Sequence, residues 1–327
     1  MRTLFFKNQP SIIATSSVGG PKESATKIGE YIEVKSDDDT FGEKTFEKAE
    51  KKMLFTAIKN SIVNSKRDSS EIDAIIAGDL LDQIISATFS ARSFDTGYLG
   101  VYNACATFTE ALTLGATLVD GGHLNNVVCG TSSHFSSAER QYRYPLELGC
   151  TRPPQAQWTV TGAGACVIGR GEGVKITSAT VGRVVDFGVT DVNNMGAAMA
   201  PAAADTLFTH FTETGLTPND YDLIISGDLG VLGSKILKDL IWQKGYDISK
   251  NHIDCGEFIY KKDEKEYQGG SGAGCSSLVF CSYFYKQLKE KKLNKILLMA
   301  TGALLSSVSS QQGESIPGIA HAVSIES

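Results

Sequence analysis

Cys105 is the residue of this chain whose type and position best suit nucleophilic chemistry. It stands in the segment 102–112, Tyr-Asn-Ala-Cys-Ala-Thr-Phe-Thr-Glu-Ala-Leu, between a short β-rich run and an apolar helical pattern. A cysteine at such a strand-to-helix turn lies near unpaired N–H groups and the positive end of the helix dipole, which lower the pKa of a thiol. The spacing therefore predicts a nucleophile-like cysteine. The alternative is a small, buried, apolar side chain that does no chemistry.

The elements around Cys105 recur later in the chain. The run 73–80, Asp-Ala-Ile-Ile-Ala-Gly-Asp-Leu, is echoed at 222–229, Asp-Leu-Ile-Ile-Ser-Gly-Asp-Leu. From Cys105 the chain passes through a helical pattern to a strand that carries Thr131, 26 residues on, and from Cys275 it does the same over an equal distance. Self-similarity of this kind outranks local propensity when a fold is predicted.

The repeat predicts an α/β chain of two pseudo-symmetric β-α-β-α-β halves, 1–172 and 173–327, with a glycine-rich junction at 169–173. Alternating strands and helices predict mainly parallel sheets covered by helices. We therefore expect two five-stranded mixed sheets, mostly parallel. The helices led by Cys105 and Cys275 are expected between the sheets, with their N-termini directed at a shared central site.

Composition disfavours several classes of function. The chain has 327 residues and a net charge of −6, which disfavours extensive nucleic-acid binding. Its seven cysteines form no CxxC pair, and the odd number favours a reducing compartment without a disulfide framework. The first eleven residues make a poor signal peptide, and no apolar run approaches the length of a membrane span. A membrane role would then act through a partner or a surface.

Longer runs of sequence resemble known families. The run 103–108, Asn-Ala-Cys-Ala-Thr-Phe, resembles the Ala-Cys-Ala-Gly-Phe segment of ketoacyl-synthase III enzymes, which have the thiolase fold. Over nearly its whole length the chain more closely resembles the stage V sporulation protein AD family of spore-forming bacteria. The runs that carry this resemblance are Ala-Gly-Asp-Leu-Leu at 77–81, Thr-Ser-Ser-His at 131–134, Ala-Glu-Arg-Gln-Tyr-Arg-Tyr-Pro at 138–145, Trp-Thr-Val-Thr-Gly-Ala-Gly at 158–164, Gly-Ala-Ala-Met-Ala-Pro-Ala-Ala-Ala-Asp at 196–205 and Gln-Gln-Gly-Glu-Ser-Ile-Pro at 311–317.

The resemblance implies a thiolase-like fold in α-β-α-β-α layers and a role in binding rather than catalysis. The expected ligand is dipicolinic acid, or its calcium chelate, bound by a component of the SpoVA transport system that is needed for dipicolinate uptake during sporulation. The expected partners are the membrane subunits of that system and a second copy of the chain, at the inner spore membrane, with no nucleic acid. No cofactor is expected, and calcium only as part of bound calcium dipicolinate.

The residues around Cys105 depart from those of a condensing enzyme. Such an enzyme needs His and Asn side chains to polarise the thioester carbonyl and stabilise the oxyanion. By resemblance, the His follows the strand at 222–226, where this chain has Gly227-Asp228, and the Asn falls near 270–272, Gly-Ser-Gly. A carboxylate at Asp228 would repel an enolate or oxyanion. We therefore predict no condensing-enzyme turnover, with residual acyl transfer left open.

Candidate ligand-binding residues are expected around Cys105, because helix N-termini attract carboxylates and so suit a planar aromatic dianion. The aspartates that follow the repeated strand, Asp79 and Asp228, fit if calcium accompanies the ligand, since calcium takes oxygen ligands. Their alternative role is structural, as acceptors of backbone N–H groups. His134 is either a donor to the ligand or a structural histidine. The other candidates are Ser133, Gln157, Thr159 and Ser271, while Arg140 and Arg143 are expected either to pair with ligand carboxylates or to lie in a dimer interface or a buried ion pair.

Two other functions remain open from the sequence. One is an acyltransferase or condensing enzyme of ketoacyl-synthase III type that uses Cys105. The other is a structural adaptor that docks membrane subunits and holds no ligand.

Overall fold

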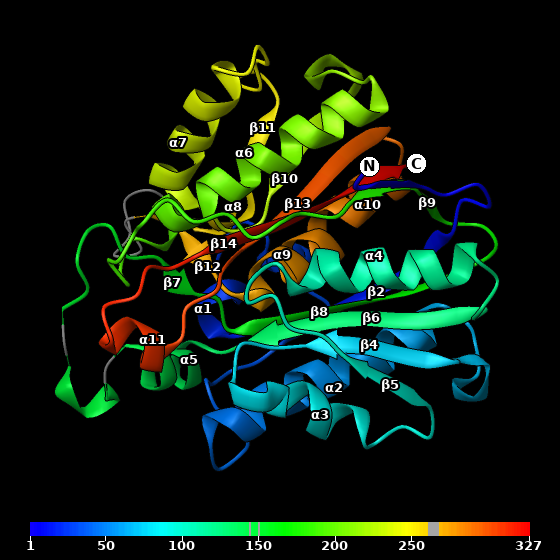
Figure 1. Cartoon of the computed structure of the whole chain (residues 1–327). Coiled ribbons are helices and arrows are strands. Elements are labelled where there is room, and N and C mark those ends of the chain that lie inside the picture. The colour runs from blue at the N-terminus through cyan, green and yellow to red at the C-terminus, as the bar shows by residue number, and fades with distance from the viewer. Residues whose placement is uncertain (144, 150, 261–267) are drawn as a thin grey trace.

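The structure is a computed structural model that describes residues 1–143, 145–149, 151–260 and 268–327 (Figure 1). Its strands are β1 (Thr3–Phe5), β2 (Ser11–Gly19), β3 (Val34–Lys35), β4 (Ala74–Gly78), β5 (Gly97–Gly100), β6 (Asn126–Ser133), β7 (Trp158–Thr159), β8 (Gly162–Gly169), β9 (Val174–Thr180), β10 (Leu223–Ser226), β11 (His252–Asp254), β12 (Gly270–Ser271), β13 (Lys295–Ala303) and β14 (Gly318–Glu326). Its α-helices are α1 (Pro21–Ser24), α2 (Phe46–Asn64), α3 (Ile85–Ala91), α4 (Thr107–Asp120), α5 (Phe135–Tyr142), α6 (Met195–Thr214), α7 (Gly230–Trp242), α8 (Cys255–Ile259), α9 (Ala273–Val279), α10 (Tyr285–Lys289) and α11 (Ser307–Gln311).

Apart from β7 and β12, which pair with each other, the strands of the two halves are hydrogen-bonded into one sheet. Its order is β11-β10-β13-β14-β9-β2-β8-β6-β4-β5, and β1 and β3 pair with β9 and β2. The halves join where β2 pairs with β9 over two residue pairs, Ser11 with Lys175 and Ile12 with Val174. The prediction of two separate five-stranded sheets is therefore wrong, although each half does contribute five strands to the path. On each side of this short join, the five strands of one half follow in a corresponding order.

The prediction of mostly parallel pairing is also wrong. In the first half β2-β8 and β8-β6 are antiparallel, whereas β6-β4 and β4-β5 are parallel. The second half repeats this pattern, with β9-β14 and β14-β13 antiparallel and β13-β10 and β10-β11 parallel. The reason is that β8 and β14 run against both of their neighbours. Only the outer strands of each half follow the parallel arrangement that helical crossovers impose.

The sequence repeat corresponds to a repeated hydrogen-bonding device at the strand starts. One carboxylate oxygen of Asp73 accepts from the backbone N–H groups of residues 125–126, at 2.6 and 3.0 Å. The equivalent oxygen of Asp222 accepts from the N–H groups of residues 294–295, at 2.5 and 3.0 Å. Each aspartate thus ties the start of β4 or β10 to the start of the next strand, β6 or β13. The repeated runs 73–80 and 222–229 therefore begin with the same structural device in both halves.

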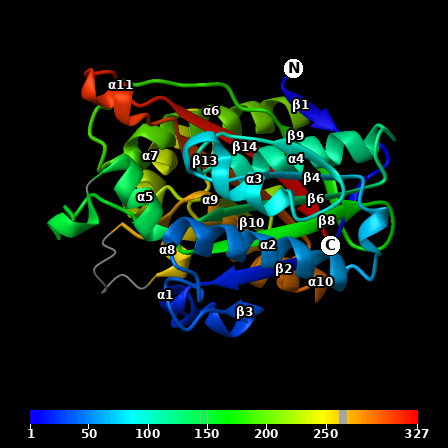
Figure 2. The same cartoon turned by 90° about the horizontal axis from the view of Figure 1, so that it is seen from below.

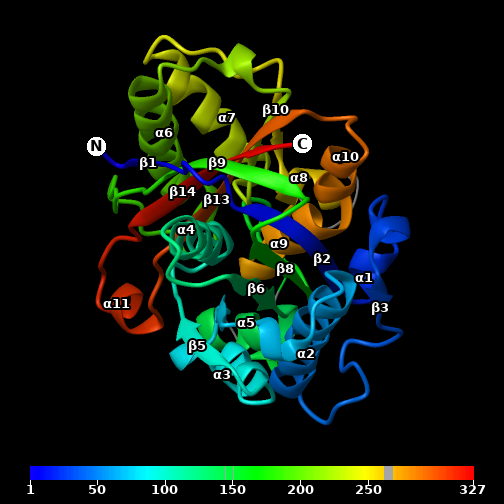
Figure 3. The ribbon, with the colours of Figure 1, turned by 90° about the vertical axis from the view of Figure 1, so that its right-hand side faces the viewer.

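The helices α4 and α9 lie in the middle of the molecule, as predicted. Figure 3 shows them between the strands of the two halves, with α2 and α3 on one outer face and α6 and α7 on the other. Viewed from below, α2 lies alongside β2, and it contacts both β2 and β8 (Figure 2). The rings of Phe108 in α4 and Phe280, which follows α9, have centroids 5.9 Å apart. The segments led by Cys105 and Cys275 therefore meet at the centre.

The apolar pattern after Cys105 accounts for the burial of α4. Phe108, Ala111, Leu112, Ala116 and Val119 are fully buried, and their spacing places them along one side of a helix. In the described ranges no helix is long and apolar enough to cross a membrane. The six cysteines within those ranges are free and buried, while Cys150 lies outside the described residues.

Candidate functional site

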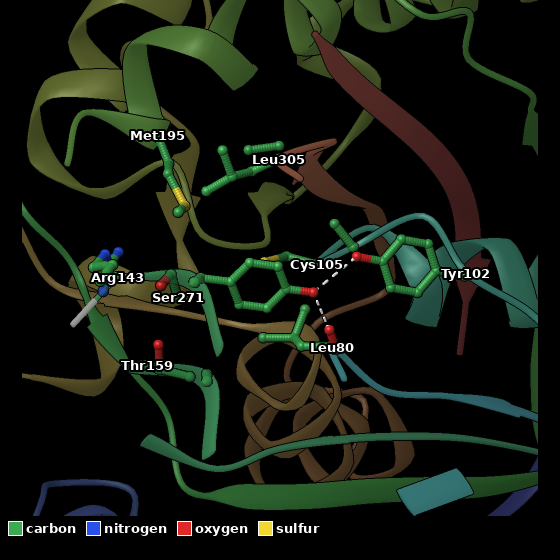
Figure 4. Close-up of a pocket in the computed structure, with 12 residues that line it drawn as sticks. Leu80, Tyr102, Cys105, Arg143, Thr159, Met195, Ser271 and Leu305 are labelled. Atoms are coloured by element: carbon green, nitrogen blue, oxygen red, sulfur yellow. Dashed lines mark hydrogen bonds between the residues drawn. The ribbon is translucent and has the colours of Figure 1, made fainter. Parts of the chain in front are cut away.

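A cavity lies at the N-terminal end of α4, beside Cys105 (Figure 4). It comprises about 420 Å³ of space free of protein atoms, counting the open solvent at its mouth. Most of its wall is apolar, and Arg143, Thr159 and Ser271 lie together on one side of it (Figure 4). The lining residues are Leu80, Tyr102, Ala104, Cys105, Ala138, Tyr142, Arg143, Thr159, Met195, Ser271, Ala303 and Leu305.

The turn that carries Cys105 is held by close backbone packing. Ala104 has a φ of 50°, in the left-handed region that costs energy for a non-glycine residue. The Thr107 hydroxyl donates to the Ala104 carbonyl at 2.6 Å. On strand β13, a Cβ at Gly302 would clash with the carbonyl oxygen of Asn103, so only glycine allows the strand to approach this turn. Contacts from the other half of the chain therefore fix the position of Cys105.

The thiol of Cys105 does not have the lowered pKa that the sequence predicts. Cys105 is only 7% exposed to solvent. This burial raises the pKa of its thiol well above the ordinary value. The neighbouring carboxyl group of Asp228 raises the pKa further, by its charge and by a hydrogen bond with the thiol. A hydrogen bond from the Gly272 backbone lowers the pKa of Cys105, but it is outweighed. The prediction of a thiolate-favouring position is therefore wrong, because desolvation disfavours the charged form.

Asp228 lies behind the cavity wall in a network of hydrogen bonds. Its Oδ1 accepts from the hydroxyl of Thr301 at 2.7 Å, and its Oδ2 accepts from the backbone N–H of Gly272 at 3.2 Å. The Nε2 of Gln157 donates to its backbone carbonyl and to that of Gly270. Burial raises the pKa of Asp228 to about 6. Asp228 and Gln157 thus join β10, β12 and β13 next to Cys105, although neither lines the cavity.

The raised pKa of Asp228 has a measurable consequence for stability. A carboxyl group whose pKa is higher in the folded state favours folding while it is protonated, so the free energy of unfolding falls as pH rises from about 4 to about 6. We expect Asp228→Asn to remove about 2 kcal/mol of this decline. Urea unfolding at about pH 4.5 and about pH 7.5 measures it, with Asp239→Asn, an exposed aspartate of α7, as the control. An equal decline in wild type and Asp228→Asn would contradict the prediction.

Two of the predicted site residues line the cavity together with Cys105. Thr159 and Ser271 are partners in the two-stranded sheet of β7 and β12, so the pairing places them side by side. Ser133 lies next to this sheet but outside the cavity. Its hydroxyl donates to the carbonyl of Val160 at 2.7 Å and accepts from the N–H of Gly274 at 3.0 Å. Ser133 therefore has the contacts of a structural residue.

Asp79 and His134 do not line this cavity, in contrast to their predicted place beside Cys105. Asp79 is fully buried, and its carboxylate oxygens accept from the N–H groups of Leu81 at 2.8 Å and Ala87 at 2.7 Å. His134 is also fully buried. Its Nδ1 accepts from the N–H of Ser136 at 3.1 Å, at the start of α5, so its Nε2 donates to the carbonyl of Asp39 at 2.6 Å. These contacts match the alternative roles given above, in which Asp79 accepts backbone N–H groups and His134 is a structural histidine.

The aromatic side of the cavity was not predicted from the sequence. The Tyr142 hydroxyl donates to the Leu80 carbonyl and lies 3.1 Å from the hydroxyl of Tyr102, as the dashed lines in Figure 4 show. Tyr142 belongs to the run 138–145, in which only the arginines stood out as possible ligands. Tyr102 stands close before Cys105 in the chain, and this proximity is the one signal that could have identified it.

The two arginines of the run 138–145 have different surroundings. Arg140 forms an exposed ion pair with Glu47, whereas Arg143 lines the cavity and pairs with Glu139. Of the alternatives considered for Arg143, the structure therefore has the buried ion pair.

Among the described residues that line the cavity, none is a histidine or an asparagine. Within the described parts of the chain, no group of three or more His, Cys, Asp or Glu side chains could hold a metal ion. What the arrangement offers is a partly enclosed, mainly apolar space with a protonated thiol, hydroxyl groups and a guanidinium group at its wall.

Comparison with known proteins places the chain in a family and a fold. The family model described as stage V sporulation protein AD matches residues 1–326. The stage V sporulation protein AD of Bacillus subtilis (strain 168) is 42% identical over 326 residues, which are 99% of this chain and 96% of that protein.

Solved condensing enzymes share the fold. The 3-oxoacyl-[acyl-carrier-protein] synthase III of Aquifex aeolicus VF5 matches with a TM-score of 0.59 and 14% identity, over 97% of this chain and 100% of that one. A variant of OleA from Xanthomonas campestris matches with a TM-score of 0.63 and 12% identity, over 99% of both chains. At these identities the likeness is one of fold, and the fold of this chain is thiolase-like.

Proposed function

The chain belongs to the stage V sporulation protein AD family, and from this premise we propose that it binds dipicolinic acid, alone or as its calcium chelate, for uptake during sporulation. It is a sporulation protein with a thiolase-like fold. In this proposal it catalyses no acyl transfer. It works beside the membrane subunits of the SpoVA system, at the inner spore membrane, as a homodimer.

The observation that carries the proposal is that the cysteine at the wall of the cavity is protonated. Burial and the Asp228 carboxyl group raise the pKa of the Cys105 thiol, so the nucleophilic thiolate is disfavoured. The remaining wall has the chemistry of a binding site: apolar side chains for a ring, and Arg143, Thr159 and Ser271 for carboxylate oxygens. Cys105 then contributes a small, polarisable surface to the pocket.

Binding of dipicolinate to the purified chain tests the proposal. Isothermal titration with and without calcium is expected to give binding by wild type. Cys105→Phe is expected to weaken it by about 100-fold, because the larger side chain fills the cavity. Cys105→Ala is expected to stay within about threefold, because only a weak contact is lost.

Cys281→Ala, a buried cysteine away from the cavity, is the matched control, and thermal melts of each variant check folding. Wild type that binds no dipicolinate would overturn the proposal. Equal binding by wild type and a folded Cys105→Phe variant would place the ligand elsewhere in the molecule.

A further inference from the structure

Two arginines share one carboxylate beside the Cys105 cavity. The Oε1 of Glu139 accepts from Arg143 Nη1 and, at 2.5 Å, from Arg152 Nη1. The side chains of Arg143, Arg152 and Glu139 are 5%, 16% and 9% exposed. Two positive charges therefore face one negative charge in a site that is largely removed from water. Burial, and next the charge of Arg143, lower the pKa of Arg152.

Each arginine also has a buried nitrogen that finds no hydrogen-bond partner among the residues that the structure describes. These atoms are Arg143 Nε and Arg152 Nη2. A buried donor that makes no hydrogen bond costs free energy, and more so when its group is charged. Glu139 cannot satisfy both guanidinium groups because it is one carboxylate with one negative charge. The two donors, and a positive charge that no further carboxylate among the described residues is shown to pair, point to an anion as the missing acceptor.

A second cavity adjoins the side chains of the two arginines. This cavity, of about 790 Å³ counting its mouth, is lined by Glu139, Arg143, Arg152 and Trp158 among others. Arg143 lines both this cavity and the cavity at Cys105. The rings of Trp158 and Phe135 are stacked with centroids 3.8 Å apart, and the Arg152 guanidinium carbon lies 5.4 Å from each centroid. Flat apolar groups thus flank the charged ones.

We propose that Arg143 and Arg152 form a carboxylate-binding site on the wall shared by the two cavities, and that its ligands are small planar carboxylic acids. The carboxylate accepts from Arg143 Nε and Arg152 Nη2 and compensates the second positive charge. Glu139 holds the two arginines in place and limits their attraction for anions. This inference rests on the proposed function in one respect: dipicolinate would place one of its carboxylates here.

Substitution of the arginines tests the site. The probes are dipicolinate, benzoate and the neutral analogue benzamide, titrated against the full chain by calorimetry or ligand-observed NMR. Wild type is expected to bind both carboxylates and not benzamide. Arg143→Gln and Arg152→Gln are each expected to weaken carboxylate binding by about 10-fold or more, as for the loss of a charged hydrogen bond. Arg140→Gln, in helix α5 shortly before Arg143 but outside both cavities, is the matched control and is expected to bind as wild type.

Glu139→Gln distinguishes a ligand site from a purely structural ion-pair network. It removes the internal competitor, so it is expected to tighten carboxylate binding by about threefold or more. A purely structural role predicts weaker binding together with a lower melting temperature. If Arg143→Gln does not fold, Arg143→Lys keeps the charge but lacks the Nε donor, and it is expected to weaken binding as well.

The outcomes separate this site from the proposed function. Binding of benzoate that depends on both arginines, without binding of dipicolinate, would support the site and overturn the proposed ligand. Binding of dipicolinate that is unchanged in the arginine variants would overturn the site and leave the proposed function standing. Failure of wild type to bind either carboxylate would overturn both.

Discussion

Incubated with acyl-CoA and malonyl-CoA, the purified protein is expected to release no CoA above background, and Cys105 is expected to carry no acyl group. Catalysis by a condensing enzyme requires a thiolate and donors for the developing oxyanion. In this chain burial and Asp228 hold the Cys105 thiol protonated. Among the described residues that line the cavity, no histidine or asparagine supplies the donors.

The expected size of this effect follows from the missing groups. Loss of one oxyanion donor costs about 10²- to 10³-fold in rate, and two donors and the thiolate are affected here. Turnover should therefore lie roughly 10⁴-fold or more below that of a condensing enzyme. Intact-mass spectrometry and CoA release measure the two steps, with a ketoacyl synthase III assayed in parallel. Release of CoA by wild type that disappears in Cys105→Ala would show that the site is catalytic.

The second large effect is expected at Asp79, on the stability of the fold. Asp79→Ala removes the acceptor of two buried backbone N–H groups, those of Leu81 and Ala87. Each unsatisfied donor costs about 1–3 kcal/mol, so a loss on the order of 3 kcal/mol in the free energy of unfolding is expected. Part of the loss is offset because Glu50, whose pKa is raised by burial and next by Asp79, no longer faces a second carboxyl group.

Urea unfolding and thermal melts measure this loss. Asp79→Asn keeps one acceptor oxygen and should be intermediate, while Asp82→Ala, in the adjoining exposed turn, is the control and should melt as wild type. Asp79→Arg should fail to fold, because a bulky cation would replace a fully buried acceptor of two backbone N–H groups. A folded Asp79→Arg variant with normal stability would contradict the structural role.

The sequence alone determined the plan of the fold. The repeat of 73–80 at 222–229 corresponds to β4 and β10 with the turns that follow, and its first aspartate makes the same pair of hydrogen bonds in both halves. The equal spacing after Cys105 and Cys275 predicted that both segments meet at the centre, and they do. These features could be predicted from the sequence because they depend on short local patterns that occur once in each half of the chain.

The pairing that joins the two halves could not be predicted from the sequence. The two-residue contact between β2 and β9 has no sequence signature, because backbone pairing does not require particular side chains. The antiparallel direction of β8 and β14 was likewise hidden, since their apolar runs are equally typical of buried parallel strands.

Only the tertiary structure decided the roles of the site residues. Asp79 and Asp228 follow the same repeated strand, yet Asp79 is satisfied by residues 81 and 87 nearby in the chain, whereas Asp228 contacts Cys105, Gly272 and Thr301 from distant segments. The local pattern at Cys105 predicted a lowered pKa, and burial reversed its direction. The physical reason is the same in each case: desolvation and long-range partners set the properties of a buried polar group, and neither is encoded in the residues beside it.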